Sequence, residues 1–205
     1  MKPFETSTSH IDNQLWIQLQ AGSEWALGRL VKKYFNPLQN YGCKFVPSED
    51  FVKDCVQEVF IEVWQRRERL STPISVRAYL LSSVRKKVLR EGFRQRILKD
   101  EHHEIDRVLD WHSLELPHEW AIIEQENVEL LTQKITMLLD KLPKRQREVI
   151  YLQFYQNLNR DEIAQIMEIN PQSVSNLVQS ALKVFRAHWQ VIQVFLGLIS
   201  FHRQF

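Results

Sequence analysis

The sequence is poor in glycine, which occupies 5 of its 205 positions, and it lacks alternating apolar and polar stretches bounded by turn pairs. Both absences argue against β-sheets, because tight hairpin turns rely on glycine and half-buried strands alternate between apolar and polar residues. An apolar content of 44% is nevertheless sufficient for a packed core. The sequence therefore predicts an all-α protein.

Cysteine is also scarce, and the two that occur are Cys43 and Cys55. Both fall on predicted apolar helix faces, so we interpret them as buried, reduced thiols; a disulfide stays open as the alternative, although nothing indicates an oxidising compartment. The first ten residues lack the apolar core of a signal peptide. The longest apolar stretch, 191–201, is shorter than the roughly 20 residues of a membrane span. We therefore expect a cytoplasmic protein with no membrane insertion.

Motifs of catalysis are missing as well. The sequence contains no phosphate-binding glycine-rich loop, no HExxH motif and no nucleophile with an evident base. His102, His103, Glu104 and His112 form a cluster by composition, but adjacent residues do not share a helix face and a metal site needs converging ligands. We predict no enzyme activity, no cofactor and no metal site.

Charge is distributed unevenly along the chain, although the net charge is only +2. Between Arg77 and Lys99, eight basic residues stand against the single acid Glu91. A helix of one charge sign repels itself unless phosphates or acids neutralise it. Residues 100–119 reverse the balance, with seven acids against Arg107, and we interpret them as an acidic linker between two domains.

Apolar residues at three- and four-residue spacing predict amphipathic helices before this linker. We expect a short helix after Asp12, a second after Ser23 that Pro37 kinks or divides, a third over about 49–69, and a fourth that carries the basic run. The third presents Asp54, Gln57 and Glu58 on its polar side. By itself this polar strip is typical of a solvated helix face.

The clearest local pattern covers residues 142–186. Asn159 with Glu162 predicts a capping box at the start of one helix, and Asn170 with Pro171 predicts the start of another after a tight turn. The polar face of the second helix carries Gln172, Ser173, Ser175, Asn176, Gln179, Ser180, Lys183 and Arg186. This arrangement predicts a helix-turn-helix whose polar side chains suit base edges, with an ordinary helical hairpin as the alternative.

Two stretches together resemble a known family. The first is DCVQEVFIEVW at 54–64, followed by VRAYLLSSVRKKVL, and the second is LPKRQREVIYLQFYQNLNRDEIAQIMEINPQSVSNLVQSALKVFR at 142–186. In this order, with an acidic linker between them, they are similar to the two domains of extracytoplasmic-function (ECF) sigma factors. The resemblance covers about 24–99 and 131–186. It implies a subunit that binds core RNA polymerase, directs it to promoters and helps to open the duplex.

The resemblance also implies roles for particular residues. Asp54, Gln57 and Glu58 match family positions that bind the clamp helices of the polymerase β′ subunit. The loop 69–75 matches one that receives a flipped base of the minus-ten promoter element. The implied minus-ten contacts are Arg69, Ser71, Thr72, Arg77, Arg85, Lys86 and Arg90. The implied minus-thirty-five contacts are Arg145, Arg147, Gln172, Ser173, Ser175, Asn176, Gln179 and Lys183.

Some positions depart from the family pattern. Glu168 stands where the helix-turn-helix turn usually has glycine, and Leu177, Ser180 and Leu182 stand where many relatives have arginine. Because few cations remain on this helix to bind phosphates, we expect weak duplex binding by the isolated chain.

We expect four parts of the chain: a docking and minus-ten domain at 11–99, the acidic linker at 100–119, a helix-turn-helix domain at 120–190 and an apolar tail at 191–205. Family members are commonly held by an anti-sigma factor, and the tail packs either against such a partner or against this chain. The alternative function is a DNA-binding regulator that acts without polymerase and binds duplex DNA tightly. The poor cation content of 172–180 argues against it.

Overall fold

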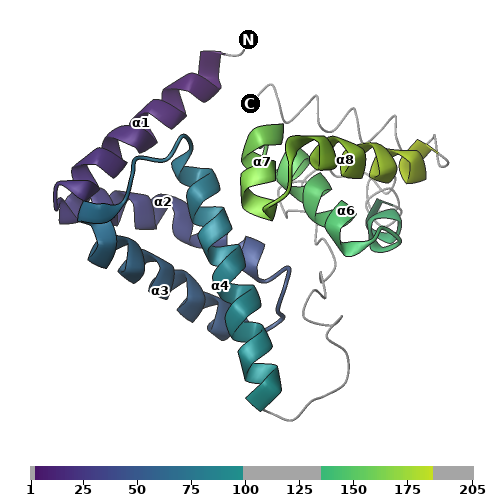
Figure 1. Ribbon diagram of the computed structural model, residues 1–205, viewed down its shortest axis with the longest axis horizontal. Coiled ribbons are helices and arrows are strands. Elements are labelled where there is room, and N and C mark those ends of the chain that lie inside the picture. Colours follow the sequence, from purple (N-terminus) through teal and green to yellow (C-terminus); the bar gives the residue numbers. More distant parts are fainter. Residues whose placement is uncertain (1–2, 99–134, 187–205) are drawn as a thin grey trace, which may run out of the picture. The chain divides into compact units, whose positions relative to one another are not determined.

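The computed structural model describes residues 3–98 and 135–186, and the regular elements within these two ranges are helices, with no strand among them (Figure 1). The predicted all-α class is confirmed. The described residues fall into two compact units, one before and one after residue 110, apart from three residues of α7. Every helix in the described part is too short or too polar to span a lipid bilayer.

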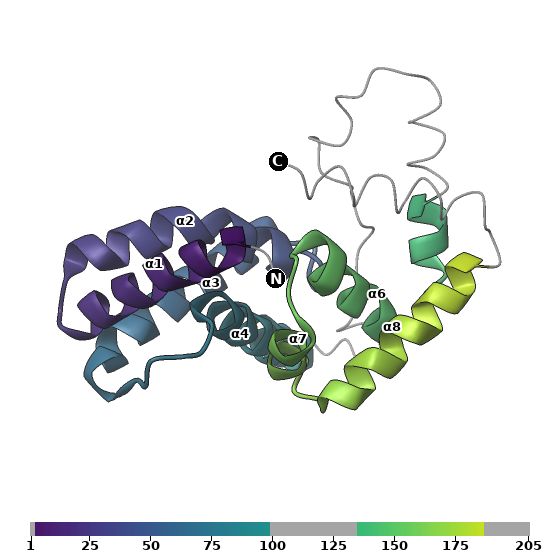
Figure 2. The same cartoon turned by 90° about the horizontal axis from the view of Figure 1, so that it is seen from above.

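The first unit is a bundle of four helices. They are α1 (Pro3–Gln20), α2 (Glu24–Gly42), α3 (Glu49–Arg66) and α4 (Val76–Leu98), with the 3-10 turn η1 (Arg67–Arg69) after α3. α2 packs against the other three helices, and α3 and α4 pack against each other (Figures 1 and 2). The loop between η1 and α4, residues 70–75, is therefore anchored at one end by α3 and η1 and at the other by α4.

Serine side chains start two of these helices. The backbone N–H of Ala26 donates to Ser23 Oγ at 3.3 Å, and that of Phe51 donates to Ser48 Oγ at 3.4 Å. Such caps satisfy backbone donors that have no partner within the helix. α2 then continues through Pro37 to Gly42 as one helix, so the predicted division at Pro37 did not occur.

The helix α1 begins before Asp12, so the predicted start at this residue is wrong. The Asp12 carboxylate is buried and accepts hydrogen bonds from Lys33 Nζ and Tyr34 Oη, both on α2. A carboxylate with two such donors on a neighbouring helix is better satisfied there than as a cap of its own helix. Asp12 thus fixes α1 against α2.

The core of this unit is closely packed where α2 ends. A Cβ atom added to Gly42 would lie 2.5 Å from Cγ1 of Val52, and the side chains of Val84 and Val88 lie just beyond. Glycine therefore allows α2 to approach α3 and α4 at this point. Cys55, also in this core, is a buried free thiol, whereas the free thiol of Cys43 is half-buried.

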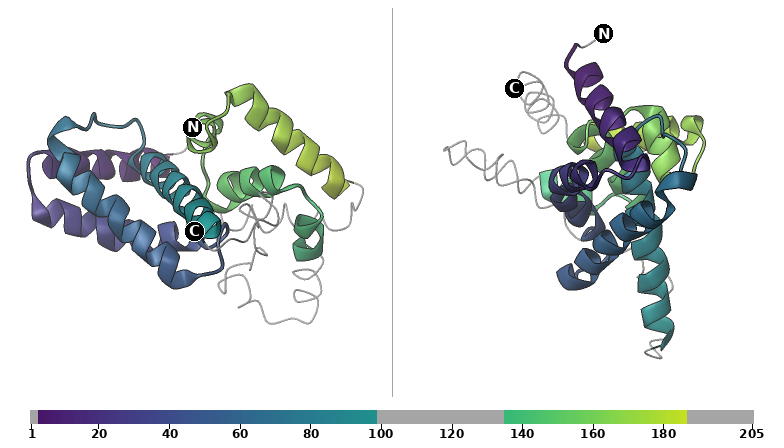
Figure 3. Two further views of the ribbon diagram at one scale, coloured as in Figure 1. Left: turned by 60° about the horizontal axis from the view of Figure 1, so that its bottom comes forward. Right: turned by 90° about the vertical axis from the view of Figure 1, so that its left-hand side faces the viewer.

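The second unit contains a helical segment at 135–140, then α6 (Lys144–Ile150), a π-helical turn η4 (Tyr151–Tyr155), α7 (Arg160–Met167) and α8 (Pro171–Arg186). α8 lies beside α6 (Figures 1 and 3). In η4 the rings of Tyr151 and Tyr155 stack with their centroids 4.7 Å apart.

The predicted helix-turn-helix is confirmed in α7 and α8. The Asn159 side chain accepts from the N–H of Glu162 at 3.0 Å, and the Glu162 carboxylate accepts from the N–H of Asn159 at 3.0 Å. The Asn170 side chain accepts from the N–H of Ser173 at 2.7 Å. Between the helices, Glu168 takes the left-handed conformation with φ of 54°, which explains why this position favours glycine.

Candidate functional site

The polar face of α3 is the first candidate surface. Asp54, Gln57 and Glu58, hereafter the docking strip, are all exposed on α3. Their three- and four-residue spacing sets them on one side of the helix. Ile61 continues the same face and is 52% exposed, which is unusual for a large apolar side chain in the middle of a packed helix. Ile61 is not among the site residues predicted from the sequence, although its spacing from Gln57 and Glu58 identifies it as part of this face.

Glu58 also has a partner within the chain. Lys87 of α4 is buried, and its Nζ lies 2.6 Å from Glu58 Oε2 and 2.6 Å from Glu62 Oε1. Burial acts to lower the pKa of Lys87, but the hydrogen bonds and charges of the two carboxylates outweigh it, and the net shift is upward. The hydrogen bond from Lys87 lowers the pKa of Glu62. One docking-strip residue therefore also stabilises the contact between α3 and α4.

The thiol of Cys55 lies on the buried side of the same helix. Burial, followed by the nearby negative charge of Glu58, raises its pKa to about 11. A thiol with such a pKa is protonated and unreactive at neutral pH. This environment agrees with a structural cysteine.

The loop between η1 and α4 is the second candidate surface. Arg69, Ser71 and Thr72 are exposed, as the predicted base-binding role requires. The apolar side chain of Ile74, which is not among the site residues predicted from the sequence, is 94% exposed. The loop is held at one end, because the Gln20 side chain of α1 hydrogen-bonds both the Leu70 carbonyl and the Thr72 hydroxyl.

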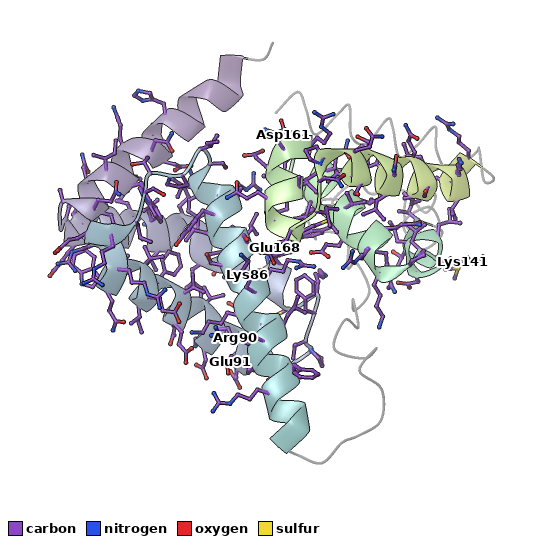
Figure 4. All side chains as sticks on the ribbon, viewed as in Figure 1. Lys86, Arg90, Glu91, Lys141, Asp161 and Glu168 are labelled. Atoms are coloured by element: carbon purple, nitrogen blue, oxygen red, sulfur yellow. The ribbon has the colours of Figure 1, made fainter. Side chains whose placement is uncertain are left out.

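The predicted cations of α4 divide into two groups. Lys86 and Arg90 are exposed, and Figure 4 shows them along α4 with Glu91. Arg77 is half-buried. Arg85 is only 9% exposed, with its guanidinium 5.9 Å from the ring centroid of Phe45. In this conformation Arg85 has little surface to offer to a phosphate.

Glu91, the single acid of the basic run, is engaged by its neighbours. Arg90 Nε lies 3.1 Å from one carboxylate oxygen, and Arg94 Nη1 lies 3.9 Å from the other. Both arginines remain well exposed, with side-chain exposures of 68% and 75%. The pairs thus leave the guanidinium groups accessible to a phosphate.

The exposed face of α8 is the third candidate surface. Gln172, Asn176, Gln179 and Lys183 are exposed and recur at spacings of three and four residues. The Gln172 amide donates to Asn176 Oδ1 at 3.2 Å, which aligns the two side chains. Ser173 and Ser175 are half-buried, and Ser175 Oγ donates to the Pro171 carbonyl at 3.3 Å. The face of α8 that is open to DNA is therefore narrower than predicted, because Ser173 and Ser175 are only partly exposed.

The two arginines predicted near this helix also differ. Arg145 is exposed on α6. Arg147 has a side chain only 14% exposed, and its Nη1 lies 3.4 Å from Asp140 Oδ1. Arg145 is therefore better exposed than Arg147. Two acidic side chains, Asp161 and Glu168, are also exposed at the two ends of α7 (Figure 4).

Several predictions fall outside the described residues. These are the acidic linker at 100–119, the cluster of His102, His103, Glu104 and His112, and the apolar tail at 191–205. Within 3–98 and 135–186, no group of three or more potential ligands could hold a metal ion. The proposed domain boundaries stay predictions.

Sequence comparisons identify two family regions in this chain. The protein-family model described as "Sigma-70 region 2" matches residues 30–96, and the family model described as "Sigma-70, region 4" matches residues 132–184. The first range contains the docking strip, the loop and most of α4, and the second contains α6 to nearly the end of α8. No curated protein is significantly similar to the chain in sequence.

Solved structures share the fold. The structure of CnrH in complex with the cytosolic domain of CnrY is 19% identical, with a TM-score of 0.56, and the alignment covers 87% of this chain and 97% of that one. The sigma factor RpoE in complex with the anti-sigma factor NepR, from Bartonella quintana, is 14% identical, with a TM-score of 0.56, and the alignment covers 82% of this chain and 96% of that one.

Proposed function

The chain belongs to the ECF sigma factors of the sigma-70 family, which direct RNA polymerase to promoters in transcription initiation, and we propose that it does so through three exposed surfaces. The observation that carries the proposal is the occurrence of regions 2 and 4 in one chain, each with a polar helix face turned to solvent. Sigma factors are not catalysts, and this chain contributes no catalysis of its own.

The docking strip binds the clamp helices of the polymerase β′ subunit. Asp54 and Gln57 are exposed, and their side chains make no hydrogen bond or ion pair within the described ranges, so both side chains are available to a partner. Carboxylates and an amide at helical spacing form charge-assisted hydrogen bonds with basic residues across an interface, which fixes register as well as affinity. Ile61 adds apolar area beside these polar groups.

The loop 69–75 and the exposed side of α4 bind the opened minus-ten element. The loop carries the exposed polar residues Ser71 and Thr72, which suit a base that has left the stack. Exposed Lys86 and Arg90 bind the phosphates of the same strand. Arg85 contributes through its packing against Phe45 rather than by touching DNA. Capture of an unstacked base favours the melted state and so helps to open the duplex.

The exposed face of α8 reads the minus-thirty-five element. Amide side chains such as Gln172, Asn176 and Gln179 make hydrogen bonds to base edges in the major groove. Lys183 and Arg145 bind the flanking phosphates. Because so few cations are exposed here, the affinity of the free chain for duplex DNA is low, and attachment to polymerase provides the missing contacts.

A regulatory protein controls access to these surfaces. The solved RpoE structure contains an anti-sigma factor, NepR. A comparable partner of this chain covers the docking strip and α8, and so excludes polymerase and promoter DNA at once. The site of action is the cytoplasm, where core polymerase transcribes.

Gel filtration with purified bacterial core polymerase tests the docking proposal. The full-length chain is expected to co-elute with core, and Asp54→Lys is expected to elute separately while retaining the wild-type circular dichroism spectrum. A wild-type chain that never co-elutes with core, yet binds duplex DNA tightly and specifically, would instead support a regulator that acts alone.

A further inference from the structure

We propose that Gln20 is a positioning residue that fixes the direction of the Thr72 hydroxyl, and that Thr72 therefore selects a captured base bearing an exocyclic amino group. This inference rests on the proposed role of the loop 69–75 in minus-ten binding. It adds a residue from α1, which lies before the range matched by the region 2 model.

The Gln20 side chain connects α1 to a loop about fifty residues later in the sequence. Its Nε2 donates to the backbone carbonyl of Leu70, and its Oε1 lies 3.0 Å from Thr72 Oγ1. Both polar ends of the amide are thereby used. The contact holds the loop between Leu70 and Thr72, whereas Ile74 projects 94% exposed beyond it.

These two bonds determine which atom of the Thr72 hydroxyl is left for a ligand. The Leu70 carbonyl can only accept, so the amide nitrogen of Gln20 must face it and the amide oxygen must face Thr72. That oxygen can only accept, so the single hydroxyl hydrogen of Thr72 is donated to it. Thr72 is exposed, and its hydroxyl thus presents acceptor lone pairs, and no donor, to a base that enters the loop.

The position of Gln20 is fixed by the packing of α1. Trp16 and Leu19 are fully buried, and the Trp16 ring meets the ring of Tyr79 on α4 edge to face, with centroids 5.1 Å apart. The hydrogen bonds of Asp12 to α2 secure the same helix. These contacts hold α1 in place, and the two hydrogen bonds of Gln20 therefore clamp the loop to a packed helix.

An acceptor at Thr72 discriminates between bases. Adenine, cytosine and guanine each carry an exocyclic amino group that can donate to Thr72 Oγ1. Thymine has no amino group, and its single ring donor lies between two carbonyl oxygens that weaken a hydrogen bond to a further acceptor. One neutral hydrogen bond gained or lost corresponds to an effect of about 3- to 10-fold.

The test uses holoenzyme assembled from core polymerase and the full-length chain, on fork templates that are single-stranded across the minus-ten element. Each position of the single strand is varied through all four bases, and the lifetime of the open complex is measured. Wild type is expected to show one position at which thymine shortens the lifetime about 3- to 10-fold relative to amino-bearing bases. Gln20→Leu and Thr72→Val are each expected to lose this discrimination, and the double variant to lose no more than either.

Gln18→Leu is the matched control, because Gln18 is an exposed glutamine of the same helix whose side chain makes no hydrogen bond within the described ranges. Retained discrimination in Gln20→Leu would overturn the clamp while leaving the proposed function intact. The absence of base dependence at every position in wild type would instead refute base capture by the loop. If Gln20→Leu folds poorly, Thr72→Val decides alone, and discrimination retained in that variant overturns the inference.

Discussion

Reversing the charge of Glu58 should weaken both polymerase binding and the fold, whereas reversing Asp54 should weaken polymerase binding alone. The difference arises from Lys87, whose buried ammonium group lies 2.6 Å from a Glu58 oxygen. A lysine at position 58 would set two like charges against each other at the edge of the core. Asp54 makes no such pair within the described ranges and is exposed.

The magnitude follows from the geometry. Two unit charges about 4 Å apart interact by roughly 4 kcal/mol at the effective dielectric constant typical of a protein surface. Glu58 is half exposed, so a new lysine can turn partly into water, and we expect Glu58→Lys to cost about 2–3 kcal/mol of unfolding free energy. Glu58→Gln leaves Glu62 with Lys87 and should cost about 1 kcal/mol. Asp54→Lys should stay within about 0.5 kcal/mol of wild type.

Urea unfolding followed by tryptophan fluorescence measures these stabilities, and co-elution with core polymerase measures docking. Loss of a well-placed charge pair at an interface costs about 2–5 kcal/mol, so Asp54→Lys should weaken core binding at least about 30-fold without loss of stability. Glu58→Lys with the stability of Asp54→Lys would refute the role assigned to Lys87. Asp54→Lys with wild-type affinity for core would refute the docking strip.

Three further predictions concern the fold. Gly42→Ala should destabilise the protein by about 1–3 kcal/mol, because the new Cβ would lie 2.5 Å from Val52 Cγ1. Gly28→Ala, where the new Cβ would meet no atom within 4 Å, should instead stabilise α2 by up to about 1 kcal/mol. Urea unfolding of both variants tests this, and equal effects on the free energy of unfolding would contradict it. Glu168→Gly should raise stability by about 1 kcal/mol because it relieves the left-handed conformation, and Glu168→Ala, which also removes the carboxylate but keeps Cβ, should give no gain. Since the pKa of Cys55 is raised to about 11, the rate at which iodoacetamide labels it should increase about tenfold per pH unit between pH 8 and the pKa. Cys55 should be labelled more slowly than Cys43 throughout this range, and rapid labelling of Cys55 at pH 7 would contradict its buried position.

Local signals predicted the helix-turn-helix well. The capping box of Asn159 and Glu162, and the start of α8 at Asn170 and Pro171, depend on residues within three or four positions of each other. Such interactions follow from chain geometry alone, so the sequence contains all the information that they need. The unusual Glu168 was visible only through the family resemblance, as a departure from a position that usually has glycine.

Contacts between segments that are distant in the sequence were harder to predict. Arg85 and Lys87 read as members of an exposed basic run, but Arg85 is buried against Phe45, and Lys87 is buried between two carboxylates of α3. Charged residues are rarely buried unless they are paired, and no sequence pattern reveals a pair formed between helices. The same limit applies to the clamp of Gln20 on Thr72, which joins segments 52 residues apart.

Packing also outweighed the local effect of a proline within α2. Proline at position 37 predicts a kink or a division of the helix, because it removes one backbone hydrogen bond. The buried side chains of Tyr34 and Leu38 pack into the core on either side of it and keep α2 in one piece. Tertiary burial thus outweighed the local penalty at Pro37, and α2 is not divided there.

Run-off transcription tests the central claim most directly. Purified bacterial core polymerase is combined with the full-length chain and with DNA from upstream of the gene that encodes it. Initiation at a defined start site that requires the chain, and that fails with Asp54→Lys, is the predicted result. Two results would contradict its role as a sigma factor. The first is initiation that does not require the chain, and the second is a lack of initiation together with separate elution of the chain and core polymerase.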